Sequence, residues 1–249
     1  MASNIVRSGV RRLDNFFFSG MALVVLGVVF VGFAHTYYMA GVFHAPLPNL
    51  LIHIHAVVFS LWIVTFIVQI SLVSAGRTDL HRSLGMLGFG VACAVVLLGL
   101  MASAERMERH AEPGGDTAVA ARVFYAVPTA DMVAFSVLIF FGFRERSHPA
   151  AHKRLMMIAT IALLDAAFVR WPVPVAWWRS TMHAADVCCY VLLLMIIGYD
   201  LWSTKKVHRA TLWATAFLVV LHQLRVPIGR SGVWQAYAGW VAGLVHSLR

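Results

Sequence analysis

The stretch LLIHIHAVVFSLWIVTFIVQISLVSAGRTDLHRSLG, residues 50–85, decides the fold. From residue 50 to residue 74 its only strongly polar side chains are His53, His55 and Gln69. An apolar run of this length exceeds the about 20 residues that an α-helix needs to cross a bilayer. We therefore predict a transmembrane helix, followed by a short basic turn that contains His81.

The composition of the whole chain also indicates a membrane protein. Hydrophobic residues make up 60% of the 249 residues, charged residues only 12%, and the mean hydropathy is +0.77. Soluble domains carry about 25% charged residues, so the chain does not fit that class. The net charge of +9 comes from Lys and Arg in short turns, where they orient the protein and meet lipid headgroups. We expect membrane lipids as partners and no nucleic acid.

Apolar runs elsewhere in the chain predict seven transmembrane helices in an all-α bundle. Their expected bounds are residues 16–38, 50–74, 84–103, 123–143, 155–169, 184–202 and 212–226. We divide the chain into a basic N-terminal segment, 1–15, a seven-helix transmembrane domain, 16–226, and a C-terminal segment, 227–249. The last segment is short for a full crossing, so we expect an interfacial or half-inserted helix, with an eighth span as the alternative.

The distribution of basic residues predicts the orientation. The N-terminus and the turns after the second, fourth and sixth predicted helices are all rich in Lys and Arg. The other connections are uncharged, contain acids or are rich in Trp. By the positive-inside rule the N-terminus is cytoplasmic, and we expect a multi-pass protein of the inner (cytoplasmic) membrane.

Three histidines form an expected cytoplasmic layer. His81, His152 and His208 each open a predicted helix, in the similar segments HRSLG, HKRLM and HRATL. A histidine in the first turn of a helix feels the positive end of the helix dipole, which favours the neutral, metal-binding imidazole. The alternative is that these residues are ordinary anchors at the membrane interface.

A second polar layer is expected in the outer half of the bundle. It contains five histidines and five charged residues: His35, His53, His55, His183, His222, Asp131, Asp165, Arg170, Asp186 and Arg225. A charge in the middle of a bilayer costs at least about 2.5–3.5 kcal/mol, so we expect the five charged groups to point inward and to pair. This predicts a polar cavity open to the outside, with a network that only fixes helix packing as the alternative.

Histidines that project from different helices fit b-type haem, whose iron can be held by imidazoles between packed helices. The expected inner pair is His81 with His152, and the outer pair is His222 with either His53 or His55. Because His53 and His55 lie about 200° apart around a helix, only one of them can face such a site. Two haems would form an electron path across the bilayer.

Two sequence elements carry a resemblance to known proteins. The turn His81-Arg82-Ser83-Leu84-Gly85, together with the H-x-H of residues 53–55, resembles uncharacterised bacterial polytopic integral membrane proteins. The turn is also similar to the histidine-plus-Leu-Gly element of di-haem, ascorbate-reducible b-type cytochromes. This second resemblance implies haem b, electron transfer and other membrane redox subunits as partners.

Two further functions stay open. Seven helices with a cytoplasmic N-terminus resemble intramembrane hydrolases and the progestin/adiponectin-receptor-like families, which implies Zn²⁺ held by three histidines beside a carboxylate. The candidate metal ligands and bases in this chain are His53, His55, His183, His222, Asp165 and Asp186. The third possibility is a non-enzymatic accessory subunit, or a transporter that uses the polar cavity as a relay.

Overall fold

The computed structural model describes residues 2–46, 48–110, 116–172 and 183–248. The side chains of residues 2–11 and of His183 lie outside this description. Within it the chain forms helices and turns and no β-strand, which confirms the predicted all-α class.

Six helices in the described part of the chain are long and apolar enough to cross a membrane. Two of these six include the short π or 3₁₀ turn that directly follows the α-helix. The six helices correspond to six of the seven predicted spans, so the chain is a multi-pass helical membrane protein. Their helical cores are α1 (Ala2–Phe33), which continues as a π-helix (Ala34–Tyr38), α2 (Leu50–Ser74), α3 (Thr78–His110), α4 (Asp116–Arg144), α8 (His183–Thr204) and α9 (Arg209–Arg230).

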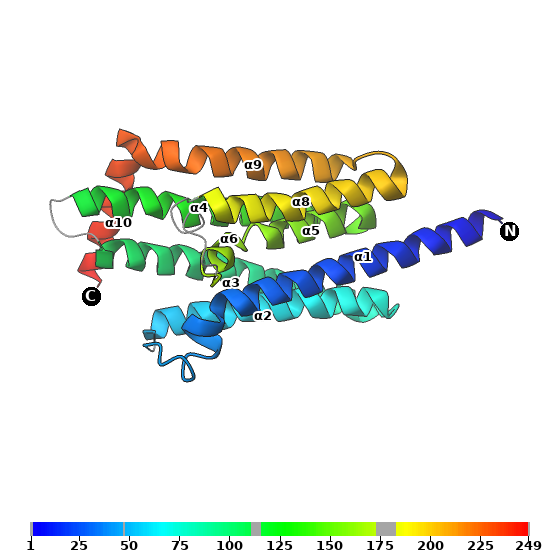
Figure 1. Ribbon diagram of the computed structural model, residues 1–249, viewed down its shortest axis with the longest axis horizontal. Coiled ribbons are helices and arrows are strands. Elements are labelled where there is room, and N and C mark those ends of the chain that lie inside the picture. The colour runs from blue at the N-terminus through cyan, green and yellow to red at the C-terminus, as the bar shows by residue number, and fades with distance from the viewer. Residues whose placement is uncertain (1, 47, 111–115, 173–182, 249) are drawn as a thin grey trace.

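The long helices run side by side in an elongated bundle (Figure 1). In this view α1 and α2 lie at one edge, α9 lies at the opposite edge, and α4 and α8 lie between them. The chain's N-terminus is at one end of the bundle, together with the turns from α2 to α3, α4 to α5 and α8 to α9. We call this end the N-terminal end; its cytoplasmic location stays a prediction.

The fifth predicted span, residues 155–169, is a broken helix. Helix α5 (Pro149–Ile161) ends inside the bundle, and after a turn the short α6 (Asp165–Phe168) follows (Figure 1). At the break, the backbone N–H groups of Leu163 and Leu164 donate to carbonyls only three residues back, at 3.1 and 2.9 Å. The Thr160 hydroxyl donates to the Met156 carbonyl at 2.9 Å, a contact that often bends helices. A seventh crossing is therefore not confirmed, and the Trp-rich connection at residues 173–182 lies outside the described residues.

A glycine allows α1 to lie directly against α6. A Cβ atom added at Gly32 would overlap the carbonyl oxygen of Ala167 and come within 2.8 Å of its Cα. Because the obstruction is backbone, it cannot move aside as a flexible side chain would. Gly32 is therefore required for this contact, which holds the broken segment in place.

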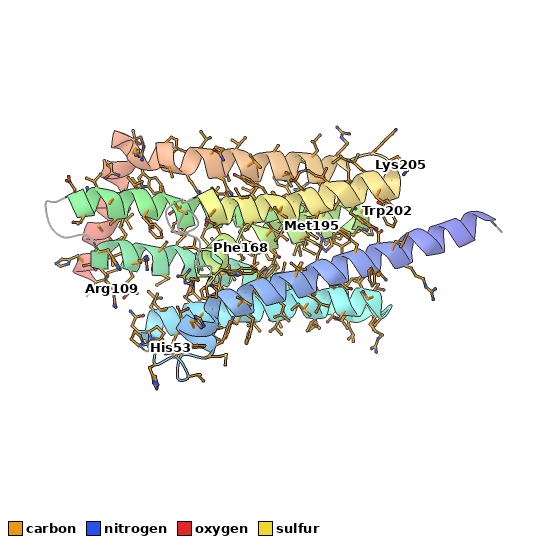
Figure 2. All side chains as sticks on the ribbon, viewed as in Figure 1. His53, Arg109, Phe168, Met195, Trp202 and Lys205 are labelled. Atoms are coloured by element: carbon orange, nitrogen blue, oxygen red, sulfur yellow. The ribbon has the colours of Figure 1, made fainter. Side chains whose placement is uncertain are left out.

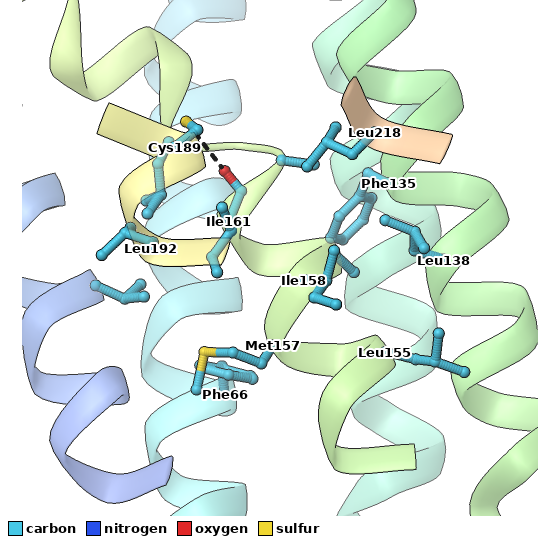
Figure 3. Packing of buried hydrophobic residues seen from close by; sticks show 14 of the residues in the cluster. Phe66, Phe135, Leu138, Leu155, Met157, Ile158, Ile161, Cys189, Leu192 and Leu218 are labelled. Atoms are coloured by element: carbon cyan, nitrogen blue, oxygen red, sulfur yellow. Dashed lines mark hydrogen bonds between the residues drawn. The ribbon is translucent and has the colours of Figure 1, made fainter. Parts of the chain in front are cut away.

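The apolar core is centred where α4, α5, α8 and α9 meet, and it extends to buried residues of α1, α2 and α3. Phe135, Ile158, Ile161 and Leu218 are fully buried there (Figure 3), and the Cys189 thiol faces the Ile161 carbonyl at 3.8 Å. By contrast, many large apolar side chains point outward, among them Leu87, Leu97, Leu194 and Leu212. Such extensive apolar exposure is typical of a surface that meets lipid.

The C-terminal helix α10 (Gly232–Ser247) lies across the end of the bundle opposite to the N-terminus (Figure 1). Ala238 is fully buried against α3 and α4, and the Trp234 indole donates to the Arg122 carbonyl at 2.7 Å. The preceding helix, α9, continues through Pro227 to Arg230, beyond its predicted end at residue 226. Helix α10 is not among the six candidate spans, and its interfacial location stays a prediction.

Candidate functional site

Five ionisable side chains from four helices meet in the half of the bundle away from the N-terminus. Asp131 comes from α4, Asp165 from the start of α6, Asp186 from α8, and His222 and Arg225 from α9. None of them is more than 7% exposed. We call these five residues the charge cluster. The prediction that charged groups point inward and pair is confirmed for Asp131, Asp165, Asp186 and Arg225.

Arg225 is the centre of the charge cluster. Its Nη1 donates to Asp131 Oδ1 at 3.2 Å and to Asp165 Oδ2 at 3.0 Å, and its Nη2 donates to Asp186 Oδ1. A planar guanidinium with several N–H groups is suited to bind carboxylates in different directions. The single cation thereby joins α4, α6 and α8 to α9.

His222 lies in the charge cluster without a well-formed hydrogen bond. Its Nδ1 is 3.2 Å from Asp186 Oδ1 and its Nε2 is 4.0 Å from Asp131 Oδ1. The Nδ1 contact is short but poorly aligned, so among the described residues neither ring nitrogen has a hydrogen-bond partner. The Asp165 Oδ1 atom is likewise buried without a partner. Buried polar atoms in folded proteins are nearly always paired, so these exceptions require an explanation.

A small cavity adjoins the charge cluster. It has a volume of about 140 Å³ and borders Arg225 between α4, α9 and α10. Its other lining residues are mostly apolar: Ala126, Thr129, Ala130, Val133, Leu221, Ile228 and Trp234. The predicted polar cavity is therefore a small, largely apolar pocket beside a buried polar cluster.

The other residues of the expected outer layer lie elsewhere. The His35 ring is exposed and packs on Phe43 with ring centres 3.9 Å apart. The exposed Arg170 donates to the Ala166 carbonyl at 2.5 Å, and its guanidinium lies over the Phe33 ring at 4.9 Å. These two residues contact their own surroundings and not the charge cluster.

The two histidines of α2 do not approach His222. His53 Nδ1 lies 3.3 Å from the Tyr37 hydroxyl, and the His55 ring packs on Phe59 with ring centres 4.1 Å apart. Helices α2 and α9 occupy opposite edges of the bundle (Figure 1), and His53 is labelled at the α2 edge in Figure 2. The structure thus does not bring the expected outer pair together.

The structure does not support the expected set of zinc ligands. Among the described residues, no group of three or more His, Cys, Asp or Glu side chains is arranged to hold a metal ion. Asp165, Asp186 and His222 do meet, but Arg225 lies among the carboxylates. The side chain of His183, the remaining expected ligand, lies outside the described residues.

The expected inner pair does meet, at the N-terminal end. The rings of His81 on α3 and His152 on α5 have centres 6.1 Å apart and planes at 79°. His152 Nδ1 is 2.7 Å from the Gly142 carbonyl oxygen, and the Gln69 side-chain amide lies 2.5 Å from His81 Nδ1. The Nδ1 atoms of both rings thus face hydrogen-bonding groups.

The third histidine of the expected inner layer has a structural role. His208 Nδ1 accepts a hydrogen bond from the Ala210 backbone N–H at 3.1 Å and caps the N-terminus of α9. Burial, and then the nearby positive charge of Arg154, lower the pKa of His208 below its ordinary value. The lower pKa keeps the ring neutral, as its role as an acceptor requires.

The sequence analysis missed a buried ion pair at the N-terminal end. Arg154 Nε donates to Asp200 Oδ1 at 2.9 Å, and both side chains are almost fully buried. Asp200 Oδ2 also accepts from the His208 backbone N–H at 3.0 Å and from the Thr211 hydroxyl at 2.7 Å. The pair joins α5, α8 and α9. Its sequence signal is Asp200 itself, an acid in the last turns of the predicted span 184–202.

No protein-family model, curated protein or solved structure matches the chain. Fold and site define a multi-pass helical membrane protein with a buried His/Asp/Arg cluster in one half of the bundle and a pair of facing histidines at the other end.

Proposed function

We propose that the chain is a membrane redox protein that binds one b-type haem between His81 and His152. The observation that carries the proposal is the 6.1 Å separation of the two ring centres, on different helices. Metal–nitrogen bonds of about 2 Å on both sides of one ion leave about 4 Å between the ligating nitrogens. The ring centres then lie somewhat further apart, in agreement with the observed separation.

The hydrogen bonds of the two rings support ligation through Nε2. A metal-bound histidine usually donates its other N–H to a carbonyl or carboxylate, which fixes the ring. The Gly142 carbonyl is placed to accept from His152 Nδ1. Ligation of His81 through Nε2 likewise requires the oxygen of the Gln69 amide to face Nδ1. Without a ligand, protein contacts favour the amide nitrogen at this position, so we expect the amide to turn when the site is filled.

The surroundings of the pair supply the other contacts that a haem needs. Phe89 of α3 and Phe143 of α4 pack nearby on one another, with ring centres 4.7 Å apart. A Cβ atom at Gly85, one turn after His81, would meet no atom within 4 Å, so there is open space beside this turn. Exposed basic side chains at the same end, Arg82, Arg144 and Arg146, provide the charge that pairs with carboxylate substituents such as haem propionates.

The proposal is for one haem and not two. A bound haem would supply reversible one-electron chemistry, tuned by its two imidazole ligands and by its surroundings. The two histidines would hold its iron, the aromatic rings would exclude water, and the arginines would balance charge. His222 lies in the charge cluster, and α2 lies at the opposite edge of the bundle, so the expected outer pair of His222 with His53 or His55 does not form.

The test is an absorption spectrum of the purified full-length protein, produced in cells supplied with haem precursors. We expect a Soret band that shifts on reduction with dithionite and is lost in His81→Ala and in His152→Ala. His148→Ala is the matched control, because His148 is exposed in the same turn region, where its Nδ1 lies 2.9 Å from Glu145 Oε2 and 3.4 Å from the Ser147 hydroxyl. A haem-free wild type, or both variants with full haem content, would contradict the proposal.

A further inference from the structure

The charge cluster carries more negative than positive charge in a buried position. Among the described residues, the three carboxylates of the charge cluster face one permanent cation, the guanidinium of Arg225. Charges buried away from water are costly unless they are paired. Protons bound by the charge cluster would lower this cost.

Unsatisfied atoms in the same place show where these protons fit. His222 is 2% exposed, and among the described residues neither of its ring nitrogens has a hydrogen-bond partner. The Asp165 Oδ2 atom accepts from Arg225, whereas its Oδ1 is buried and unpaired. Protonation of His222 would turn its 3.2 Å approach to Asp186 into an ion pair. A proton on Asp165 would occupy the oxygen that Arg225 does not reach.

From this geometry we propose that the charge cluster is a proton-binding site, which takes up and releases protons through Asp165 and His222. The step is a simple exchange: the carboxylic acid of Asp165 gives its proton to water and becomes a carboxylate, and the imidazolium of His222 does the same and becomes neutral. No oxidant, reductant or metal takes part. The proposal does not depend on the haem site at the other end of the bundle.

The site faces titratable groups from all the elements that form it. Helix α4 contributes Asp131, α6 contributes Asp165, α8 contributes Asp186, Tyr190 and the neighbouring thiols Cys188 and Cys189, and α9 contributes His222 and Arg225. The Tyr190 hydroxyl accepts a hydrogen bond from the Gln223 amide at 3.1 Å. The Tyr190 ring packs near the His222 ring. Arg225 is the only permanent cation among these groups. The carboxylates and the imidazole therefore account for the exchange.

The broken helix and the neighbouring cavity give the protons a path. Asp165 lies directly after the break between α5 and α6. Interrupted helices inside a membrane are tolerated where they are buried in protein or line a cavity, and transporters form ion sites at such breaks. The cavity of about 140 Å³ that borders Arg225 is large enough for water, and Thr129 contributes a hydroxyl to its lining. We therefore expect exchange to occur from the end of the bundle opposite to the N-terminus.

The test is infrared spectroscopy of the full-length protein in lipid bilayers, titrated between about pH 5 and 9. Exposed carboxyls are ionised throughout this range, since their ordinary pKa is about 4, so a protonated carboxyl band reports a buried acid. We expect such a band in the wild type, its loss as the pH rises, and its loss or strong reduction in Asp165→Asn. Asp79→Asn, an exposed acid at the other end of the bundle, is the matched control and should keep the band.

Each outcome decides the proposal. A wild type without a titrating carboxyl band would overturn it, and this result requires no variant to fold. A band that persists unchanged in Asp165→Asn would place the proton on another acid and overturn it as well. Removal of the band by Na⁺ at constant pH would show that a metal cation displaces the proton, and would overturn the statement that no metal takes part. The band should remain in His152→Ala, which separates this proposal from the haem proposal.

Discussion

Replacement of Arg225 by methionine tests how the charge cluster stabilises the bundle. The substitution keeps an unbranched side chain of similar length and removes the cation that contacts Asp131, Asp165 and Asp186. Loss of one partner from a buried ion pair costs about 3–5 kcal/mol, because the other partner stays buried without compensation. Neutralising a carboxylate with an ordinary pKa of about 3.9 at pH 7 costs about 4 kcal/mol, which gives the same range.

The stability lost in Arg225→Met should depend on pH and become smaller as the pH is lowered. The variant must take up a further proton in place of the lost cation, and each pH unit toward acid reduces the cost of that proton by about 1.4 kcal/mol. We therefore expect Arg225→Met to lower the free energy of unfolding by about 3–5 kcal/mol at pH 7. At pH 5 the loss should be smaller by about 2–3 kcal/mol.

The assay is denaturant unfolding of the wild type and of the variant in detergent micelles at both pH values. Arg230→Met is the matched control, because Arg230 is an exposed arginine at the end of the same helix and should change stability by less than about 0.5 kcal/mol. A loss below about 1 kcal/mol at pH 7 would refute the reasoning, as would a penalty that grows on acidification.

Three further predictions concern stability. Asp200→Asn should lower the free energy of unfolding by about 3–5 kcal/mol in the same unfolding assay, since it leaves Arg154 buried without its carboxylate; a change within about 0.5 kcal/mol would show that the pair contributes nothing. Gly32→Val should separate α1 from α6 and lower the melting temperature, whereas Gly27→Val, whose Cβ meets no atom within 4 Å, should not; equal effects would contradict the close contact with α6. The lowered pKa of His208 means that the unfolded chain binds a proton more readily, so stability should fall as the pH drops below about 6.5. His208→Asn keeps the helix cap and should weaken this pH dependence; an unchanged pH profile would assign it to other groups.

The features that sequence reasoning predicted are those that follow from the cost of transferring groups into lipid. Long apolar runs had to be helices, and ionisable residues within them had to point inward, so the convergence of Asp131, Asp165, Asp186 and Arg225 was predictable. The sequence predicts that His81 and His152 lie at the same end of the bundle, because each opens a predicted helix after a basic turn, and their rings do meet there. The sequence therefore predicts at which end of the bundle these ionisable side chains lie.

Which faces of the helices meet was much harder to predict. The sequence predicts the same depth for His55 and His222, but their helices lie at opposite edges of the bundle, and depth alone does not show this (Figure 1). The apolar run around residue 160 is continuous, whereas its break depends on a local hydroxyl contact and on the tertiary contact at Gly32. The Arg154–Asp200 pair joins residues on two separate helices, and the sequence alone does not reveal such a partner.

The central claim is that His81 and His152 hold one haem, and the most direct test is the haem content of the purified protein. A pyridine haemochrome assay, combined with a protein determination, measures haem per chain in the wild type and in His152→Ala. We expect a content that approaches one haem per wild-type chain when haem supply is ample, and close to none in the variant. A wild type that binds no haem under these conditions, or a variant that binds as much as the wild type, would contradict the account.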